Sequence, residues 1–355
     1  MVRTAILGLG NVAERIHIPA CRATKEIEIV GASEPRAERR AEMQGRFGLA
    51  ATYEDSHELL AATKPDLVLV GTPPNSHHEL CMAALRAGAD VVCEKPFVLT
   101  LAEADEVIAE AKHLGRLVAV NTQYRHMAPF RVAKERLAAD DFGRLFFLQC
   151  WQQMFHPPVF EKLAWRAALK RSTLYEFAPH ALDLICNFFD AIPASVSANI
   201  PRVRSEYDSD VLVQLSLRFP EERLAVVALN RVSHAPERYL EMRLDCERAS
   251  LRLSLGGLAR ASLEMARHRG GSRPLARLSF VRGGEARVES AGRSRVLARE
   301  SQMAFASATA ATLREFLDAR KSGERSYAGI ERAREILRLV FAGYESAETG
   351  RTVAL

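Results

Sequence analysis

A glycine-rich turn near the N-terminus has the residues needed to hold the phosphates of a dinucleotide. It directly follows an apolar segment and consists of Gly8, Leu9, Gly10, Asn11, Val12 and Ala13. This order fits the pattern Gly-x-Gly-x-x-(Gly/Ala), in which the glycines permit a tight turn and close approach to a pyrophosphate. The N-terminus of a following helix would attract the phosphates. We expect dinucleotide binding here, although glycine turns also occur for packing reasons alone.

A carboxylate ends the next apolar segment, at the spacing of roughly 20 residues that dinucleotide-binding folds use. Glu34 can accept hydrogen bonds from the hydroxyls of the adenosine ribose and would repel the additional phosphate of NADP. NAD is therefore the favoured cofactor. Arg36, Arg39 and Arg40 follow directly and could hold that phosphate if Glu34 turned away, so NADP stays open.

Two further sets of polar residues have the chemistry for hydride transfer. Lys95 follows the fifth apolar segment, where an ammonium can stabilise developing alkoxide charge, although it could also be a surface lysine. His180 has Glu176 four residues before it and Asp183 three residues after it, so one helical stripe would place two carboxylates beside an imidazole. This cluster could serve a base near its neutral titration range or bind hydroxyls. It could equally be a packing histidine on a solvated charged face.

The apolar pattern of the first third predicts the elements that position these residues. Residues 3 to 121 alternate six short apolar runs with helical segments, which is typical of a doubly wound parallel sheet. The clearest helix lies within residues 99–115, with Thr100 and Glu103 as a capping box and Gly115 at its C-terminus. The carboxyl ends of parallel strands face the ligand crevice, which is where Lys95 is expected.

The pattern changes after residue 122. We expect helices at about 127–139 and 173–188, a strand at 144–153, and five strands between 194 and 255. Two final helices, near 302–321 and 329–348, should pack against both domains. The predicted fold is α/β, with a Rossmann-type dinucleotide-binding domain over residues 1–122. An α+β substrate-binding and oligomerisation domain with a large open, mainly antiparallel sheet follows over 123–355.

Composition limits the classes of protein and partner. The 355 residues are 48% hydrophobic and 26% charged, as expected for a globular enzyme with two cores. No stretch approaches the ~18 apolar residues of a membrane span, and the N-terminus lacks a signal-peptide pattern, so we expect a cytoplasmic protein without membrane contact. We expect the uncovered face of the open sheet to be buried between the subunits of a homodimer or homotetramer. Six scattered cysteines indicate core residues, and we expect no metal.

The net charge of +5 comes from one stretch of the chain. Residues 259–299 contain ten Arg and three Glu, and they lack the interleaved aromatic residues of a base-stacking surface. We therefore expect solvated strands and hairpins there, and no nucleic-acid partner.

Taken together, the motifs resemble the glucose-fructose oxidoreductase, inositol dehydrogenase and rhizopine-catabolism oxidoreductase family. The resemblance covers nearly the whole chain, through GTPPNSH from Gly71, the Glu-Lys-Pro element at Lys95, RLVAVNTQYRHMAP, FAPHALDLICNFF and the closing GYESAETGRTVAL. It implies a nicotinamide-dependent dehydrogenase or reductase. Such an enzyme moves a hydride between nicotinamide and a CH–OH or ketone carbon of a sugar, inositol or related polyol.

The resemblance also implies roles for individual residues. Lys95, His180 and Glu176 would be catalytic, although the family usually has Asp and Gly where this chain has Glu176 and Ala178. The expected substrate contacts are Asp183, Tyr124, Arg125 and Trp165. The expected cofactor contacts are Gly8, Gly10, Asn11, Val12, Ala13, Glu34, Thr72, Pro73, His77, Glu94 and Lys95.

Two alternatives stay open at this point. A catalytically silent nucleotide-binding sensor could use the same fold, although it would have no need of Lys95 and His180. A reductase of a nonsugar cyclic diol or ketone would fit a group of aromatic residues that could also be core, namely Trp151, Phe155, Phe160 and Trp165.

Overall fold

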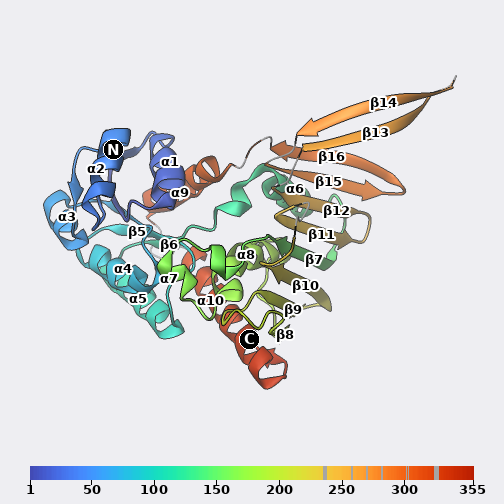
Figure 1. Ribbon diagram of the computed structural model, residues 1–355. Coiled ribbons are helices and arrows are strands. Elements are labelled where there is room, and N and C mark those ends of the chain that lie inside the picture. The colour runs from blue at the N-terminus through green and yellow to red at the C-terminus, as the bar shows by residue number, and fades with distance from the viewer. Residues whose placement is uncertain are drawn as a thin grey trace.

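The computed structural model describes residues 1–355 except 235–237, 257–258, 269–270, 281–282, 301, 303 and 324–327. For residues 259–268, 271–280 and 328 it describes the backbone alone. Two large β-sheets organise these residues, and a separate pair of strands lies outside both (Figure 1). The division into domains 1–122 and 123–355 itself stays a prediction.

The first sheet has six parallel strands in the order β3-β2-β1-β4-β5-β6. The strands are β1 (Val2–Leu7), β2 (Ile27–Ser33), β3 (Thr52–Tyr53), β4 (Leu67–Val70), β5 (Asp90–Cys93) and β6 (Val118–Val120). The central strands β4 and β5 are buried throughout, because helices cover both faces of a parallel sheet. The strand order reverses between β1 and β4, which is where doubly wound sheets bind ligands. The predicted Rossmann-type sheet is confirmed.

Short helices connect these strands. They are a π-helical turn η1 (Ala13–His17), α1 (Ile18–Arg22), α2 (Ala37–Phe47), α3 (Ser56–Thr63), η2 (Pro74–Ser76), α4 (His77–Arg86) and α5 (Leu101–Leu114). In α5 the Thr100 hydroxyl accepts from the backbone N–H of Glu103, and the Glu103 carboxylate accepts from the backbone N–H of Thr100. Gly115 ends the helix with a φ of 64°, a left-handed conformation that suits glycine. The predicted caps of this helix are confirmed.

The second sheet has nine strands in the order β16-β15-β12-β11-β7-β10-β9-β8-β17. They are β7 (Leu145–Gln153), β8 (Ser195–Asn199), β9 (Leu212–Phe219), β10 (Arg223–Asn230), β11 (Leu240–Cys246), β12 (Ser250–Leu255), β15 (Gly284–Ser290), β16 (Arg293–Glu300) and β17 (Val353–Ala354). The pair β7 and β10 is parallel and the other neighbours are antiparallel. The predicted mainly antiparallel sheet is thus confirmed, and the last strand, β17, is an addition.

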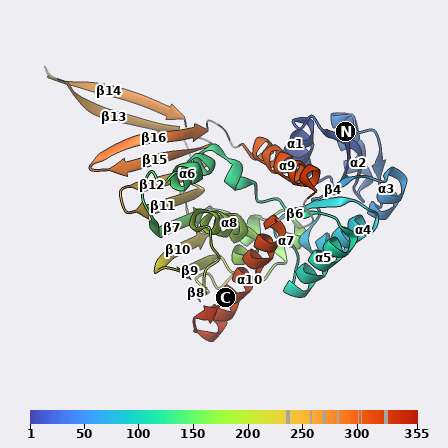
Figure 2. The same cartoon turned by 180° about the vertical axis from the view of Figure 1, so that it is seen from behind.

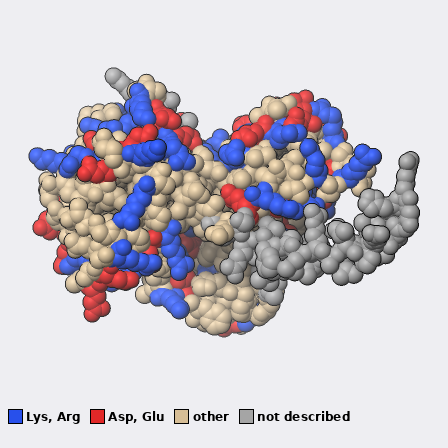
Figure 3. Space-filling view, turned by 90° about the horizontal axis from the view of Figure 1, so that it is seen from above, with Lys and Arg blue, Asp and Glu red and all other residues tan. Residues whose placement is uncertain are grey.

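The Arg-rich stretch forms hairpins, as its alternating pattern predicts. Strands β13 (Ala259–His268) and β14 (Gly271–Phe280) pair with each other outside the nine-stranded sheet, while β15 and β16 form its edge (Figure 1). On this edge Glu285 forms ion pairs with Arg287 and Arg299. Seen from above, Lys and Arg are interspersed with Asp and Glu over the described surface (Figure 3). The absence of a nucleic-acid partner stays a prediction.

Helices cover one face of the second sheet. The remaining helical segments are η3 (Gln123–His126), α6 (Ala128–Ala138), η4 (Pro158–Phe160), α7 (Ala164–Ala167), a π-helical turn η5 (Thr173–Phe177), α8 (Ala178–Phe189), α9 (Phe305–Ser322) and α10 (Ala328–Thr349). Helices α6, α8 and α10 pack on the sheet. Helix α9 packs against α1 and η1, and Figure 2 shows it beside α1 from behind. The final helices therefore contact both parts of the chain, as predicted.

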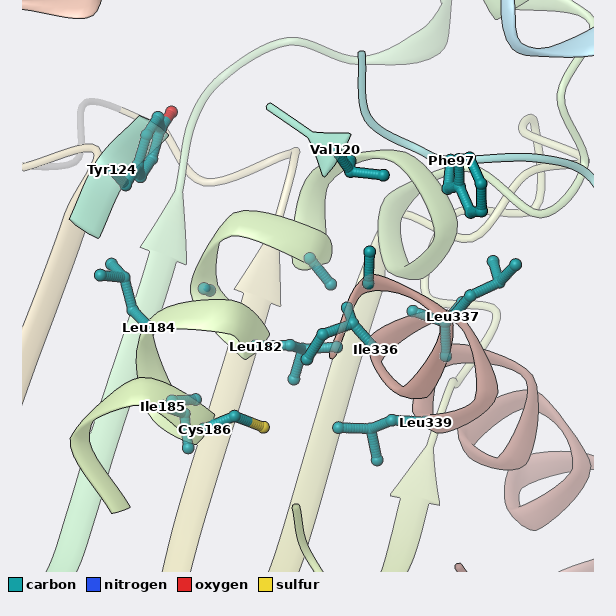
Figure 4. Packing of buried hydrophobic residues seen from close by; sticks show 14 of the residues in the cluster. Phe97, Val120, Tyr124, Leu182, Leu184, Ile185, Cys186, Ile336, Leu337 and Leu339 are labelled. Atoms are coloured by element: carbon teal, nitrogen blue, oxygen red, sulfur yellow. The ribbon is translucent and has the colours of Figure 1, made fainter. Parts of the chain in front are cut away.

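A shared apolar core joins the two parts. Phe97 and Val120 from the first part pack near Leu182 of α8 and near Ile336 and Leu337 of α10 (Figure 4). Helix α8 is buried along nearly its whole length. All six cysteines are buried and unpaired, as the sequence predicts. Within the described residues, no helix combines the length and the hydropathy that crossing a bilayer requires.

Candidate active site

The glycine turn has the shape that a pyrophosphate requires. Gly8 has a φ of +90°, and a Cβ there would lie 3.0 Å from the carbonyl oxygen of Gly71 at the end of β4. No described atom lies within 4 Å of the place where a Cβ on Gly10 would be, so the backbone stays open to a ligand. Ala13 is fully buried against the sheet. These residues fit a dinucleotide at the switch point between β1 and β4.

The helix after this turn contains a π-helical turn that directs His17 under the sheet edge. The backbone N–H of Ile18 donates to the carbonyl of Ala13, one residue further back than in an α-helix. His17 Nε2 then donates to Glu94 Oε1 over 2.8 Å, and Asn121 Nδ2 donates to the same oxygen over 2.7 Å. Burial alone would raise the pKa of Glu94, but the hydrogen bonds from His17 and Asn121 and the nearby positive charges together outweigh it, and the pKa falls to about 2.

The Glu34 carboxylate is at the predicted end of β2 and is 5% exposed. Arg36 Nε and Nη2 donate to its two oxygens over 2.7 and 3.2 Å. Burial would raise the pKa of Glu34, but these hydrogen bonds hold it below its ordinary value. Arg39 and Arg40 donate to backbone carbonyls and to other carboxylates. Of the three arginines that could hold a 2′-phosphate, Arg36 is the one with an exposed side chain.

His77 ties together two loops at the carboxyl end of the sheet. Its Nδ1 lies 3.0 and 2.9 Å from the carbonyl oxygens of Pro96 and Phe97, and its Nε2 lies 2.8 Å from that of Thr72. The side chain is fully buried, and burial lowers its pKa. The structure therefore connects the loop at Thr72 with the Glu-Lys-Pro loop through this imidazole.

Lys95 reaches from the end of β5 to the second part of the chain. Its Nζ donates to the backbone carbonyl of Glu176 over 3.1 Å and lies 3.6 Å from Glu176 Oε1. The structure thus brings together two of the residues that the sequence assigns to catalysis.

A second π-helical turn, η5, holds Glu176 at the start of α8. Arg166, from the short helix α7, forms an ion pair of 2.7 Å with Glu176 Oε1. Asp183 instead pairs with Arg125 through two hydrogen bonds of 2.6 and 3.2 Å. Among the described residues, neither carboxylate hydrogen-bonds to His180. The expected imidazole between two carboxylates therefore does not form, because η5 changes the helical phase and each carboxylate has an arginine partner.

His180 is a buried, neutral imidazole. Its ring stacks on Tyr124 with a centroid distance of 4.0 Å and an interplanar angle of 7°. Its Nδ1 is buried and has no hydrogen-bond partner among the described residues. Burial and, to a smaller extent, the nearby charge of Lys95 lower the pKa of His180 to about 3. This pKa lies well below the near-neutral value that the sequence leads us to expect, and the catalytic role of His180 stays a prediction.

The aromatic residues of the predicted substrate region separate into different places. Tyr124 is buried on His180. Trp165 is half-buried, and the guanidinium of Arg166 lies 4.9 Å from its ring centroid. Trp151, Phe155 and Phe160 are exposed rather than core, and the ring of Phe155 packs edge-on against Phe160 and stacks on His234.

Four polar residues of this region were not predicted. They are His17, Asn121, Arg166 and Arg231. Asn121 lies within a segment that carries the family resemblance, but nothing distinguished it there. Arg166 lies in the short helix α7, in a stretch where the sequence shows no regular pattern. Arg231 follows a strand in an arginine-rich chain, so neither arginine had a local signal.

The fold and this site define a nicotinamide-dependent oxidoreductase. Residues 2–122 match the family model described as "Oxidoreductase family, NAD-binding Rossmann fold" of the GFO/IDH/MocA group, and residues 130–252 match the C-terminal domain of the same group. The chain belongs to this family of oxidoreductases. The family predicted from the sequence motifs is thereby confirmed.

Two relatives of this chain are named for their activities on a glucoside and on an inositol. D-Glucoside 3-dehydrogenase of Escherichia coli is 30% identical over 145 residues, 41% of this chain and 41% of that protein. Myo-inositol 2-dehydrogenase of Thermotoga maritima is 30% identical over 157 residues, 44% of this chain and 47% of that protein. The aligned part is thus less than half of the length of each of these two relatives.

The fold is also shared along the whole chain with solved structures. An oxidoreductase from Agrobacterium radiobacter, solved with NAD+, L-tartaric acid and magnesium, has a TM-score of 0.83. The match covers 99% of this chain and 98% of that one at 19% sequence identity. At this identity the likeness shows the common fold alone. Among the described residues, no group of three His, Cys, Asp or Glu side chains could hold a metal ion.

Proposed function

We propose that this oxidoreductase moves a hydride between NAD and a CH–OH or ketone carbon of a sugar, inositol or related polyol. The observation that carries the proposal is the hydrogen bond from Lys95 Nζ to the backbone carbonyl of Glu176, close to a buried His180. The named activities of the two relatives, on a glucoside and on myo-inositol, support the substrate class.

His180 is proposed as the acid-base residue. Because burial keeps the imidazole neutral, its free Nδ1 can accept the proton of a substrate hydroxyl. The stacked ring of Tyr124 fixes the plane in which that nitrogen must meet the hydroxyl. In the reverse direction, the same nitrogen returns the proton to the new alcohol.

Lys95 is proposed to hold the reacting oxygen. As the hydroxyl loses its proton to His180 and its carbon loses a hydride, charge develops on that oxygen, and the ammonium stabilises it. When bound, nicotinamide supplies the acceptor for the hydride. Glu176 keeps Lys95 in place through its carbonyl, and its free Oε2 can accept from a neighbouring substrate hydroxyl.

For the cofactor, we propose NAD over NADP. The glycine turn, Asn11, Val12, Thr72, Pro73 and His77 would surround the dinucleotide, and Glu34 would face the adenosine ribose. The engagement of Arg39 and Arg40 within the protein supports this preference, because it leaves Arg36 alone to meet a 2′-phosphate.

We further propose a cytoplasmic homodimer or homotetramer. The open face of the second sheet carries exposed Trp151 on β7, beside half-buried Val226 and Ala228 on β10. An apolar strip of this kind favours burial against a second copy. The unpaired thiols agree with a reducing compartment. A monomeric mass in light scattering at micromolar concentration would contradict the assembly.

The experiment that tests the function follows nicotinamide absorbance with the purified protein and NAD. Inositols, aldoses, ketosugars, sugar acids and nucleotide sugars form the substrate panel. We expect at least one polyol class to reduce NAD, and the Lys95→Met protein to lose that reduction. Binding of NAD without turnover of any panel member would favour a silent sensor.

A further inference from the structure

Arg231, directly after β10, is a buried arginine with a free edge. The residue is 2% exposed, and its guanidinium lies 4.5 Å from the ring centroid of Phe177. Nη1 donates to the hydroxyl of Ser172 over 2.6 Å. Nε and Nη2 are buried and have no hydrogen-bond partner among the described residues.

This free edge is costly for the protein alone. A buried donor without a partner loses its hydrogen bonds to water, and the loss is larger when the group is charged. The charges of Glu176 and Glu161 act on Arg231 from nearby, but no carboxylate of the described residues forms an ion pair with it. Because native proteins pair nearly all buried polar groups, an unpaired pair of donors needs a reason.

The free edge lies beside the candidate active site. Ser172 and Phe177, the two contacts of Arg231, flank the π-helical turn that contains Glu176. The carbonyl of Arg231 accepts from the backbone N–H of His156, at the start of the segment that leads to Arg166 in α7. Arg166 Nε is also buried and without a partner in the described part of the chain. Two guanidinium groups with free donors thus border Glu176.

We propose that the substrate is a polyhydroxy acid, such as a sugar acid, and that Arg231 binds its carboxylate. Nε and Nη2 form one edge of the planar guanidinium, and two parallel N–H groups match the two oxygens of a carboxylate. Arg166 Nε provides a further donor beside this pair. This inference rests on the proposed function, because it places the hydroxyl to be oxidised at His180 and the carboxylate at Arg231.

A phosphate is the other anion that an arginine recognises. It brings three acceptor oxygens and close to two charges, whereas the free edge of Arg231 offers two donors. The carboxylate therefore fits the edge better, and sugar phosphates become one arm of the test.

The test uses sets of ligands that differ at one carbon. We would titrate the NAD-bound protein with D-glucuronate, D-glucose and D-glucose 6-phosphate, and with the matching galactose set, by calorimetry. We expect at least one acid to bind ~10-fold or more tightly than its neutral sugar and its phosphate. Arg231→Met should remove that advantage, and Arg231→Lys should restore only part of it, because an ammonium cannot form the planar pair of bonds.

Arg223 provides a matched control on the same strand. Its guanidinium lies 5.4 Å from the ring centroid of Phe189, at the opposite end of β10, and it donates to the backbone carbonyl of Phe189. Arg223→Met should leave the affinity for the acids unchanged. An equal loss of acid affinity in both variants would overturn the assignment of Arg231.

Thermal unfolding without ligand separates binding from folding. Because the edge of Arg231 is unsatisfied in the ligand-free protein, Arg231→Met should unfold at the same temperature or higher. A clearly lower unfolding temperature in Arg231→Met, but not in Arg223→Met, would overturn the proposal and make Arg231 structural.

The proposed function and this inference fail in different ways. If a neutral polyol reduces NAD as well as its acid does, and Arg231→Met changes neither, the oxidoreductase proposal stands and the carboxylate site is wrong. Tighter binding of the sugar phosphates than of the acids, or no binding of any acid, would likewise overturn the assignment of Arg231 as a carboxylate site. If acids bind through Arg231 but no panel member reduces NAD, the hydride-transfer proposal fails alone.

Discussion

Glu94 and Glu176 are two buried glutamates close to Lys95, and they differ in how their oxygens are satisfied. Glu94 accepts hydrogen bonds on Oε1 from two side chains, and its Oε2 lies 3.3 Å from the backbone nitrogen of Lys95. Glu176 has charged partners on Oε1, whereas its Oε2 has none among the described residues. The first carboxylate has hydrogen-bond partners within the protein for both of its oxygens, whereas the second has one buried oxygen without a partner among the described residues.

The same difference separates the two π-helical turns. The turn η1 directs His17 into the closed network around Glu94, which extends through Asn121 to the hydroxyl of Thr309 on α9. The turn η5 holds Glu176 among Lys95, Arg166 and Arg231, where several donors and acceptors are unpaired. The first turn therefore stabilises the backbone segment that carries Lys95, and the second holds the residues that we propose to meet the substrate.

Among the variants of these residues, Lys95→Met should have the largest effect on turnover. Lys95→Met removes the ammonium that meets the Glu176 carbonyl and the reacting oxygen, so turnover should fall by about 10³-fold. The dissociation constant for NAD should stay within a factor of about three, because the phosphates are held at the glycine turn. Steady-state absorbance and fluorescence titration measure the two quantities. Full turnover in this variant would remove Lys95 from the mechanism.

His180→Asn should lower turnover by about 10²-fold, the usual scale of acid-base assistance. The helix around position 180 should stay intact in this variant, so the loss of turnover would report the loss of the imidazole. A Tyr124→Phe control keeps the ring under His180, so it should retain most of the activity. If His180→Asn kept the rate of the parent protein, the proton would have to leave by another route.

The two glutamates should respond differently to loss of charge. Glu94→Gln breaks a closed buried network, so the free energy of unfolding should fall by about 1–3 kcal/mol. Glu176→Gln should cost less stability and change KM and turnover more, because its free oxygen faces the ligand. Urea denaturation and steady-state kinetics of both variants test this. Equal destabilisation would mean that Glu176 is as structural as Glu94.

The low pKa of His180 predicts how stability depends on pH. In the unfolded chain a histidine binds a proton below its ordinary value of about 6.5, whereas the folded protein holds His180 neutral down to about 3. Stability should therefore fall as pH decreases from 6.5 towards 3, since the unfolded state binds the additional proton. Unfolding temperatures of His180→Asn should fall less over this range. Parallel curves for both proteins would contradict the buried neutral imidazole.

The parts of this molecule that the sequence predicted are those with local causes. The six strands of the first sheet follow from short apolar runs, and the caps of α5 follow from Thr100, Glu103 and Gly115. Lys95 and His180 were identified through motifs. The pairing of Glu176 with Arg166 was not, because the two residues lie in different elements. The extra residue of η5 also changes the helical phase, and no pattern of residue types marks a π-helical turn.

The smallest expected effect concerns cofactor choice at Glu34. Its carboxylate would accept from the ribose hydroxyls of NAD and repel the phosphate of NADP, while Arg36 already lies on both of its oxygens. Glu34→Gln removes the repulsion and frees Arg36 to meet a phosphate, so the preference for NADH over NADPH should narrow by about tenfold. Glu42→Gln, which removes an exposed partner of Arg39, should leave the preference unchanged. Fluorescence titrations with both dinucleotides measure the ratio. Tighter binding of NADPH than NADH by the parent protein would instead show that Arg36 controls the choice.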